Sequence, residues 1–421
     1  MSIPRRSLLV AGGSIAALLG SGIRPGVAGA DEPPQADASV VTQWNQVLLR
    51  IVRTPAMRQP TVHPTRSFAM LHAAMHDAVA AIHGQSGPRL VDVAGAPGAS
   101  PVAAAAQAAH DTVVALHPGA AVDLGRQLGV SLAAVHDLRA RTAGIRVGAR
   151  TAALVVARRG DDGSAATPPT LEPGTLAGQF RPAPPAFENA AFTHWPAVTP
   201  FVLDRADQFC PVPFPALVSA RYHEAITEVK YLGGSTNSGR RADQTGQAHF
   251  WAAPIHHYWY DLAGSAVAAD NVDLVTAARV FNDLSLTFAD ATIAGYEAKY
   301  HHLLWRPVTA IRHDAATDDD IDWTPLLDTP GTPSYPAGHS AIAQAGATVL
   351  AHHFGTRDAI TITSETTNTT RSYDSFQAVA DEAGLSRIAA GVHTRLDHES
   401  GQPLGRGVAE FVLNRETRSA R

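Results

Sequence analysis

The sequence predicts an all-α protein built as a helical bundle, and three observations lead to this expectation. Apolar residues recur at helical spacing in most long segments, as at Phe68, Leu71 and Met75. The composition is rich in alanine and contains only two lysines, Lys230 and Lys299, which suits helices. No convincing set of strands is present.

Size and charge limit the classes of function. The chain has 421 residues, enough for one large domain or two ordinary ones. It is 45% hydrophobic and 17% charged, with a net charge of −5. This small negative balance argues against a surface for nucleic acid and against a polybasic patch for a membrane.

Residues 1–30 resemble an export signal rather than part of the fold. Arg5 and Arg6 precede a short apolar run, 7–20, and the small residues 28–30 form a cleavage site before Asp31. This is the pattern of the twin-arginine route, so we expect a periplasmic or extracellular protein. A membrane anchor is the alternative, but the run is short and rich in Gly and Ser. No later stretch has about 18 apolar residues, so no membrane span is predicted.

The mature chain begins with a predicted N-terminal helical region, residues 31–200. The expected helices are 40–53, 65–83, 101–116 and 131–158. His72 and His76 are four residues apart, but no zinc-protease glutamate follows His72, so a contact between helices is favoured over a metal site. Residues 159–200 are rich in proline. We expect a surface loop draped over the core and shaping the entrance to a site, rather than a flexible linker.

Residues 201–421 are predicted to form a C-terminal helical catalytic region. The expected helices are 216–232, 240–252, 257–269, 273–302, 339–353, 371–383, 385–396 and 402–416. This region carries three short stretches, between Lys299 and Asp397, whose residues suit chemistry on an oxyanion.

The first stretch supplies two cations. Lys299 and Arg306 are seven residues apart, so both point the same way if the segment is helical. Pro307 then ends or kinks that helix. Because nearly every other cation of the chain is arginine, the lysine at position 299 indicates a specific role for a compact ammonium donor.

The second stretch combines a glycine turn with a histidine. Gly338 and His339 precede an apolar helical pattern, so His339 is expected in the first turn of a helix. A helix N-terminus offers unpaired N–H groups and the positive end of its dipole, which favour an anion. Gly338 allows the backbone to approach a ligand closely.

The third stretch pairs a histidine with a carboxylate. His393 and Asp397 are four residues apart, on one helix face, where the carboxylate can bind one ring nitrogen and leave the other as nucleophile or metal ligand. Arg387 lies six residues before His393, about 120° around an ideal helix. Only its long side chain, or an irregular helix start, brings the two together.

Together the three stretches resemble the signature shared by the vanadium-dependent haloperoxidases and the type 2 phosphatidic acid phosphatases: Lys-x6-Arg-Pro, Pro-Ser-Gly-His and Ser-Arg-x5-His-x3-Asp. The matching residues are Lys299, Arg306, Pro307, Pro336, Gly338, His339, Ser386, Arg387, His393 and Asp397. The segment around Phe250-Trp251 is similar to the soluble bacterial haloperoxidase branch. The resemblance implies the helical bundle of this superfamily.

The resemblance also implies roles for these residues. Vanadate would be the cofactor, held by Lys299, Arg306, Gly338 and Arg387, with His393 as the ligand to the metal. The catalytic residues would be His393, His339 as acid–base group and Asp397 as the residue that orients His393. The substrates would be a halide ion and hydrogen peroxide.

The sequence departs from the family's pattern at Ala337, where the family has a serine whose hydroxyl donates to the bound anion. Losing a hydrogen bond to a charged group costs roughly 1.5–3 kcal/mol, so anion affinity is expected to be lower. Fungal chloroperoxidases carry aromatic residues at the positions of Tyr296 and Thr332. Because only one of these two positions is aromatic in this chain, bromide or iodide oxidation is expected to be easier than chloride oxidation.

Two other functions stay open. A soluble exported acid phosphatase would use the same residues, with His393 attacking a phosphate ester to form a phosphohistidine and His339 protonating the leaving oxygen. A protein that only binds an anion is the third. The oligomeric state is open, and a homo-oligomer is compatible with the sequence.

Overall fold

The computed structural model describes residues 8–9, 34–84, 90–314 and 319–419. The long helices are α1 Pro34–Arg53, α2 Pro64–His83, α3 Pro101–Leu116, α4 Ala121–Ala133, α5 Leu138–Arg158, α6 Ala220–Gly233, α7 Ala242–Phe250, α8 Ile255–Asp270, α9 Leu274–His302, α10 Pro307–His313, α11 Gly338–Phe354, α12 Phe376–Ala389 and α13 Arg395–Ser419. Short 3₁₀ helices are η1 Pro55–Met57, η2 Pro118–Ala120 and η3 Trp195–Ala197, and the strands are β1 Leu8–Leu9, β2 Ile360–Thr363 and β3 Thr370–Tyr373. The predicted all-α class is confirmed.

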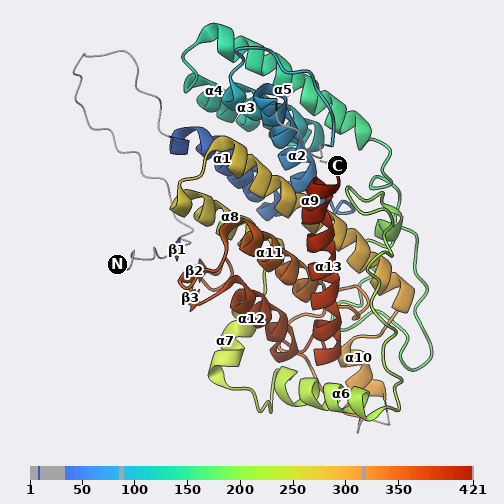
Figure 1. Ribbon diagram of the computed structural model, residues 1–421. Coiled ribbons are helices and arrows are strands. Elements are labelled where there is room, and N and C mark those ends of the chain that lie inside the picture. The colour runs from blue at the N-terminus through green and yellow to red at the C-terminus, as the bar shows by residue number, and fades with distance from the viewer. Residues whose placement is uncertain (1–7, 10–33, 85–89, 315–318, 420–421) are drawn as a thin grey trace.

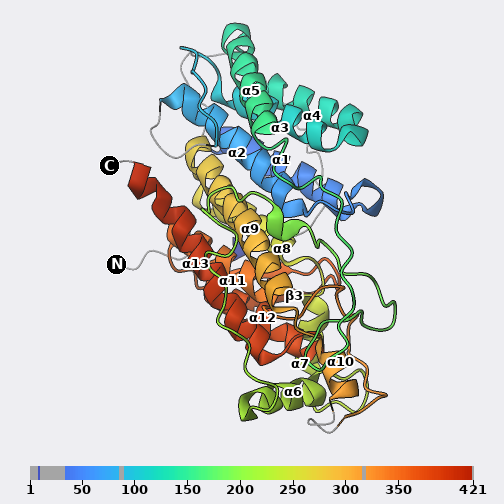
Figure 2. The same cartoon turned by 90° about the vertical axis from the view of Figure 1, so that its right-hand side faces the viewer.

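The long helix α9 runs through the middle of an elongated molecule (Figures 1 and 2). It packs against α1 and α2 on one side and against α8, α11 and α13 on the other. Helices α3, α4 and α5 lie at one end of the molecule, and α6, α7, α10 and α12 lie at the other (Figure 1). The main hydrophobic core extends from Ala38 to Val412, so it includes residues from both sides of position 200. No helix in the described ranges is long and apolar enough to cross a membrane.

The expected single helix 131–158 is wrong, because the chain forms two helices there. Helix α4 ends at Ala133, and α5 begins at Leu138. The Asp137 side chain accepts hydrogen bonds from the backbone N–H groups of Arg139 and Ala140. This N-cap starts a new helix and stabilises the break between the two.

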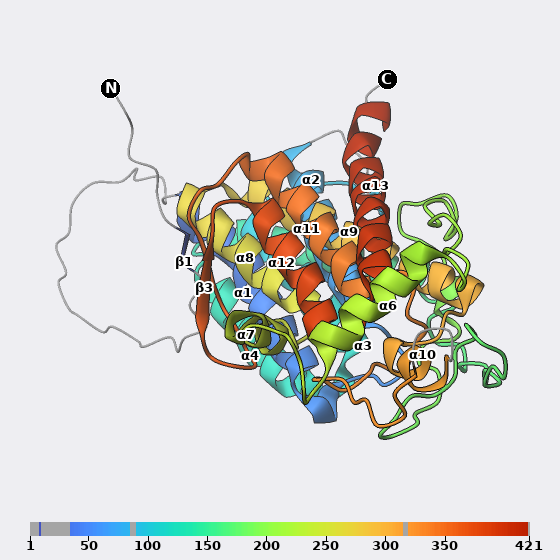
Figure 3. The ribbon, with the colours of Figure 1, turned by 90° about the horizontal axis from the view of Figure 1, so that it is seen from below.

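A small sheet is present where no strand set was expected. Strands β2 and β3 form an antiparallel hairpin in which Ile360 pairs with Tyr373, and it lies at the edge of the molecule close to α7 (Figure 3). The predicted helix 371–383 is therefore wrong in its first residues. Ser375 caps the helix that follows, α12, by accepting a hydrogen bond from Ala378 N. Ile360 and Ile362 are buried, which explains why so short a strand is retained.

Strand β1 is the described part of the first 30 residues, and it pairs in parallel with β2. The rest of the predicted twin-arginine signal lies outside the described residues. Export by this route therefore stays a prediction.

The proline-rich segment 159–200 covers the side of α9, as expected of a draped loop. Phe180 and Trp195 are buried, whereas Phe187 is 61% exposed. Just after the segment, the Asp290 carboxylate of α9 accepts hydrogen bonds from three consecutive backbone N–H groups, those of residues 201–203. These bonds fasten the chain to the helix that carries Tyr296 and Lys299.

Candidate active site

The two cations of the first stretch reach one loop from different helices. Helix α9 ends at His302, and Leu303 takes the left-handed conformation with φ 47°. The predicted helix 273–302 is confirmed by α9, so the two cations do not share a helix. Arg306 is the N-cap of α10, and Pro307 begins α10 rather than ending or kinking the earlier helix, as was predicted. Proline suits the first position of a helix because its missing N–H would be unpaired there.

Both side chains bind the loop that precedes α11. Lys299 Nζ donates to the carbonyl oxygens of Pro333 and Ser334 at 2.7 and 3.0 Å. Arg306 Nε donates to Thr332 O at 2.6 Å, and its Nη2 donates to Thr332 Oγ1 at 2.9 Å. Lys299 is 6% exposed and Arg306 is 1% exposed, so both charges are held inside the protein.

The second stretch starts helix α11, as predicted. Ala337 is the N-cap and makes no side-chain cap hydrogen bond, Gly338 is the first helical residue, and His339 lies in the first turn. A Cβ atom built on Gly338 would meet nothing within 4 Å, so the backbone at this point borders open space. Gly338 lines the cavity, and the first N–H groups of a helix have no partners within it, so an anion in the cavity could accept from the backbone here.

His393 and Asp397 make the predicted contact, but not from one helix. His393 lies in the turn after α12, whereas Asp397 lies in the first turn of α13. His393 Nδ1 is 3.2 Å from Asp397 Oδ2. The same carboxylate oxygen accepts hydrogen bonds from Ser334 Oγ and from Thr394 N, both at 2.7 Å. These three contacts fix the carboxylate, and through it the imidazole ring.

Two contacts agree on the tautomer of His393. Asp397 accepts a hydrogen bond from Nδ1–H, and Arg306 Nη1 lies 3.2 Å from Nε2, to which it can only donate. The lone pair of Nε2 is therefore directed at the arginine. Burial, followed by the charge of Arg306, lowers the pKa of His393 to about 3, so the ring is neutral at neutral pH.

Arg387 lies in the last turn of α12, and the break between α12 and α13 is the irregularity that brings it near His393. Its Nη1 donates to Trp251 O at 3.4 Å, and its buried Nε has no partner. The buried Nε2 of His339 has no partner either. The charge of Arg387, after burial, helps to lower the pKa of His339 well below its ordinary value, so the two side chains are neighbours.

The site has an excess of buried positive charge. Within the described part of the chain, Lys299, Arg306 and Arg387 make no ion pair with a carboxylate. Burial lowers the pKa of each arginine to about 10, and burial and Arg306 lower that of Lys299 well below its ordinary value. Burial alone would raise the pKa of Asp397, but hydrogen bonds from His393, Thr394 and Ser334 lower it. The charge of Asp397 acts on Lys299 and Arg306, but one carboxylate does not balance three cations, so a bound anion would balance the charge.

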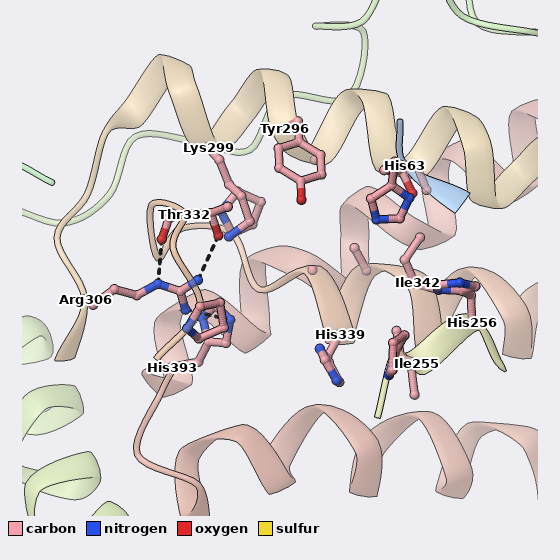
Figure 4. A pocket seen from close by; sticks show the side chains of 18 residues that line it. His63, Ile255, His256, Tyr296, Lys299, Arg306, Thr332, His339, Ile342 and His393 are labelled. Carbon is pink, nitrogen blue, oxygen red and sulfur yellow. Dashed lines mark hydrogen bonds between the residues drawn. The ribbon is translucent and has the colours of Figure 1, made fainter. Parts of the chain in front are cut away.

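These side chains surround a cavity of ≈ 240 Å³, in which Arg306 and His393 lie at one end and His339 in the middle (Figure 4). Lys299, Gly338, Tyr296 and Thr332 also line it, whereas Arg387 and Asp397 lie behind the lining residues. Two further lining residues, His63 and His256, were not predicted. His63 belongs to no motif, and the adjacent pair His256-His257 gives no signal in the sequence that separates a site residue from a core residue.

One histidine outside the cavity has structural surroundings. His72 is buried between α1 and α9, with Nε2 at 3.2 Å from Asn45 Oδ1, which agrees with a contact between helices. No group of three or more potential ligands that could hold a metal ion is found in the described ranges.

Known proteins resemble this chain in sequence and in fold. A family model, the VCPO second helical-bundle domain, matches residues 279–421. The structure of a bacterial vanadium-dependent iodoperoxidase is 27% identical in sequence and matches with a TM-score of 0.76. The match covers 92% of this chain and 98% of the iodoperoxidase chain. The holo and apo forms of a bacterial vanadium-dependent chloroperoxidase are each 14% identical, with TM-scores of 0.70 and 0.68. The match to the holo form covers 84% of this chain and 91% of the chloroperoxidase chain. The match to the apo form covers 89% of this chain and 98% of the chloroperoxidase chain, so both share its fold. No curated protein matches the chain.

Proposed function

Because this chain belongs to the vanadium haloperoxidase superfamily, we propose that it is a vanadium-dependent haloperoxidase that oxidises a halide ion with hydrogen peroxide. The observation that carries the proposal is the cluster of three buried cations beside His393, which make no ion pair with a carboxylate among the described residues. Such a cluster favours a compact oxyanion of high charge.

The residues present fit vanadate. Arg387 Nε and His339 Nε2 are buried donors or acceptors without partners, and the backbone at Gly338 borders open space. We propose that Lys299, Arg306, Gly338 and Arg387 bind the oxygens of the anion and that His393 is the ligand to the metal. Vanadate, when bound, supplies the Lewis-acid chemistry that activates hydrogen peroxide toward a halide ion.

The protein would control two protons. Asp397 holds the proton on Nδ1 of His393, which keeps Nε2 unprotonated for its role as ligand. His339 is neutral in the free site, because burial and the neighbouring cations oppose its charge. Its unpartnered Nε2 can therefore accept a proton from hydrogen peroxide and return it to the leaving oxygen.

For the halide, we propose iodide or bromide rather than chloride. Thr332 occupies one of the two positions that are aromatic in fungal chloroperoxidases, and its hydroxyl is used to bind Arg306. Tyr296 occupies the other. The relative that is 27% identical is an iodoperoxidase, which supports the same order.

The test is a titration of the mature chain, residues 31–421, with orthovanadate. Oxidation of iodide and bromide by hydrogen peroxide should rise with vanadate and saturate, and His393→Ala should abolish it. In parallel, hydrolysis of p-nitrophenyl phosphate is followed without vanadate between pH 4 and 8. Hydrolysis that vanadate inhibits, without halide oxidation, would overturn the proposal in favour of an exported acid phosphatase that acts through a phosphohistidine at His393. If neither activity appears, a protein that only binds an anion is left.

A further inference from the structure

Three titratable side chains connect the surface of the protein with the cavity. The series starts at Glu365, two residues after strand β2, whose side chain is 28% exposed. Glu365 Oε1 lies 3.0 Å from Nδ1 of His257, which is buried in the first turn of α8. The ring of His257 lies beside that of His256, with a centroid distance of 4.6 Å, and His256 lines the cavity. These contacts form a continuous path from solvent to the candidate active site.

The inner end of this path has a nitrogen without a partner. His256 is 5% exposed, and its buried Nε2 makes no hydrogen bond within the described residues. His339, whose buried Nε2 also lacks a partner there, lines the same cavity (Figure 4). Because buried polar atoms are normally paired, a water molecule between the two rings would satisfy both nitrogens and join them.

The ring of His256 does not retain a proton. Burial lowers the pKa of His256 well below its ordinary value, and so do the charges of its neighbours His257, His63, His339 and Arg53. A proton that reaches this ring is therefore passed on rather than kept.

The outer end of the path is a carboxylate that is held in place. Arg53 Nε donates to Glu365 Oε2 at 2.7 Å, and Arg53 Nη2 donates to Asp261 Oδ2 at 2.8 Å. Burial alone would raise the pKa of Glu365, but the hydrogen bonds and charges of His257 and Arg53 lower it. Glu365 is therefore ionised at neutral pH, and its negative charge attracts protons from solution toward His257.

The proposed reaction consumes one proton in each turnover. The halide ion gives an electron pair to one peroxide oxygen, the O–O bond breaks, and the other oxygen leaves as water after it takes the proton. That proton comes from solution. Lys299, Arg306 and Arg387 place three buried positive charges at the site, and these charges repel hydronium and cationic buffer acids. A path that starts at a carboxylate and continues through neutral rings avoids this barrier.

We propose that Glu365, His257 and His256 form a proton relay from solution to His339 in the cavity. The inference rests on the proposed function, which creates the demand for protons. The rings of His257 and His256 meet edge to face, with an interplanar angle of 76°, so each transfer includes a rotation of one ring about its Cβ–Cγ bond. Histidine suits this step because it accepts a proton on one nitrogen and releases it from the other.

The first test needs neither vanadate nor peroxide. NMR measures how fast the ring N–H proton of His256 exchanges with water in the ¹⁵N-labelled mature chain in phosphate buffer. Glu365→Gln removes the carboxylate with little change of shape, and His257→Phe keeps a ring without nitrogens. Each variant should slow the exchange at least about tenfold, because the proton loses its path to solvent. Unchanged affinity for inorganic phosphate shows that each variant folds, and if His257→Phe fails to fold, Glu365→Gln decides alone.

Asp261→Asn is the matched control. Asp261 pairs with the same arginine as Glu365, and the two carboxylate side chains are 25% and 28% exposed. The Asp261 carboxylate accepts from Gln46 and Arg53 and has no hydrogen bond to His257. Both variants therefore weaken the hold on Arg53, whereas Glu365→Gln alone interrupts the relay. Exchange in Asp261→Asn should equal that in the unaltered chain.

The second test measures turnover in iodide oxidation with vanadate. In Glu365→Gln and His257→Phe, kcat should fall at least about tenfold, since proton transfer by positioned groups contributes roughly 10²–10⁴-fold. The KM values for iodide and peroxide should stay unchanged, because neither residue lines the cavity. A rising concentration of acetate buffer at pH 5, whose acid form is small and uncharged, should restore kcat. A purely structural loss would not respond to the buffer.

Each outcome decides the inference. It is overturned if His256 exchanges equally fast in the unaltered chain and in Glu365→Gln, if Asp261→Asn slows the exchange as much, or if kcat is unchanged in both relay variants. The result is separate from the proposed function. Slowed exchange without any halide oxidation would remove the haloperoxidase and keep the relay, whereas halide oxidation with unchanged exchange would remove the relay alone.

Discussion

Arg306 Nη1 lies 3.2 Å from His393 Nε2 and 2.8 Å from the carbonyl oxygen of Val392. The arginine thus lies against the nitrogen that is proposed as the metal ligand, while Asp397 holds the other nitrogen of the ring. Burial and the cation keep His393 neutral, and the carboxylate on the other side holds the ring in one tautomer. This relationship makes the role of Arg306 measurable in the absence of any cofactor.

We predict that Arg306→Met weakens binding of inorganic phosphate by ten- to a hundredfold or more, because a charge-assisted hydrogen bond contributes roughly 1.5–3 kcal/mol. The pKa of His393 should rise from its value of about 3, since the charge of Arg306 is one of its causes. It should stay below the ordinary value, because burial is the larger cause. Calorimetry measures the phosphate affinity, and NMR titration of the His393 ring measures its pKa.

Arg312 provides the control for this variant. Its Nε donates to Trp323 O at 2.7 Å, and its Nη2 donates to Thr324 Oγ1 at 3.3 Å, the pattern that Arg306 makes with Thr332. Arg312 does not line the cavity. Arg312→Met should therefore leave phosphate binding unchanged, and an equal loss in both variants would show that the effect is on folding.

Ala337→Ser should tighten phosphate binding by about ten- to a hundredfold, because the new hydroxyl can donate to the anion. Ala337 is the N-cap of α11 and makes no side-chain cap hydrogen bond, so stability should rise as well, by about 1 kcal/mol. Ala120→Ser is the matched control, since Ala120 is an uncapped N-cap of α4 far from the cavity. It should raise stability without changing phosphate affinity. Unchanged affinity in Ala337→Ser would mean that the missing hydroxyl has no role.

The sequence predicted the residues of this site better than the backbone that carries them. The spacing of Lys299 and Arg306 suggested one helix, and Pro307 was read as its end. The chain instead turns at Leu303 and uses Pro307 to begin α10. Proline disfavours the helix interior and favours its first position, so the residue alone does not distinguish the two. The position of each cation depends on its bonds to the loop at 332–334, which no local pattern reveals.

His63 and His256 could not be predicted for a different reason. They come from the starts of α2 and α8, and only the packing of those helices around α9 brings their rings to 5.9 Å. The hairpin of β2 and β3 was missed because each strand has four residues, too few for a period of two to stand out. That hairpin nevertheless supplies Arg371 and Tyr373, which bind Glu382.

Trp251 connects the cluster of Arg371, Tyr373 and Glu382 to the candidate active site. Its indole Nε1 donates to Glu382 Oε1 at 3.0 Å, and its carbonyl oxygen accepts from Arg387. We predict that Trp251→Phe weakens phosphate binding, because the backbone carbonyl that accepts from Arg387 is no longer held in place by the bond from the indole to Glu382. Its stability should fall by more than that of Trp259→Phe, by about 1.5–3 kcal/mol, the contribution of a hydrogen bond to a charged group.

Trp259 is the matched control because it is equally buried and its Nε1 has no partner. Both variants remove the same atoms from a fully buried site, so the difference in their free energies of unfolding measures mainly the bond to Glu382. Chemical denaturation measures it. Equal stability of the two variants would contradict the connection through Glu382.

The buried histidines should make the protein less stable in acid. Burial lowers the pKa of His72 to about 3, below its ordinary value of 6.5. At pH values between these two, His72 is protonated in the unfolded chain and neutral in the folded chain. Stability therefore rises with pH across this window and falls as the pH drops through it. His393 and His63, with pKa values of about 3 and 4, act in the same direction.

We predict that His72→Phe reduces the slope of unfolding free energy against pH by about 1.4 kcal/mol per pH unit between pH 4 and 6, the value for one proton. The Phe ring can keep the contacts that His72 makes with Phe68 and Phe281, so the variant should fold. Urea unfolding at a series of pH values measures the slope. His136→Phe, an exposed histidine, should leave it unchanged. If His72→Phe retained the full slope, the acid sensitivity would have to come from other groups, such as His393 and His63 at the cavity.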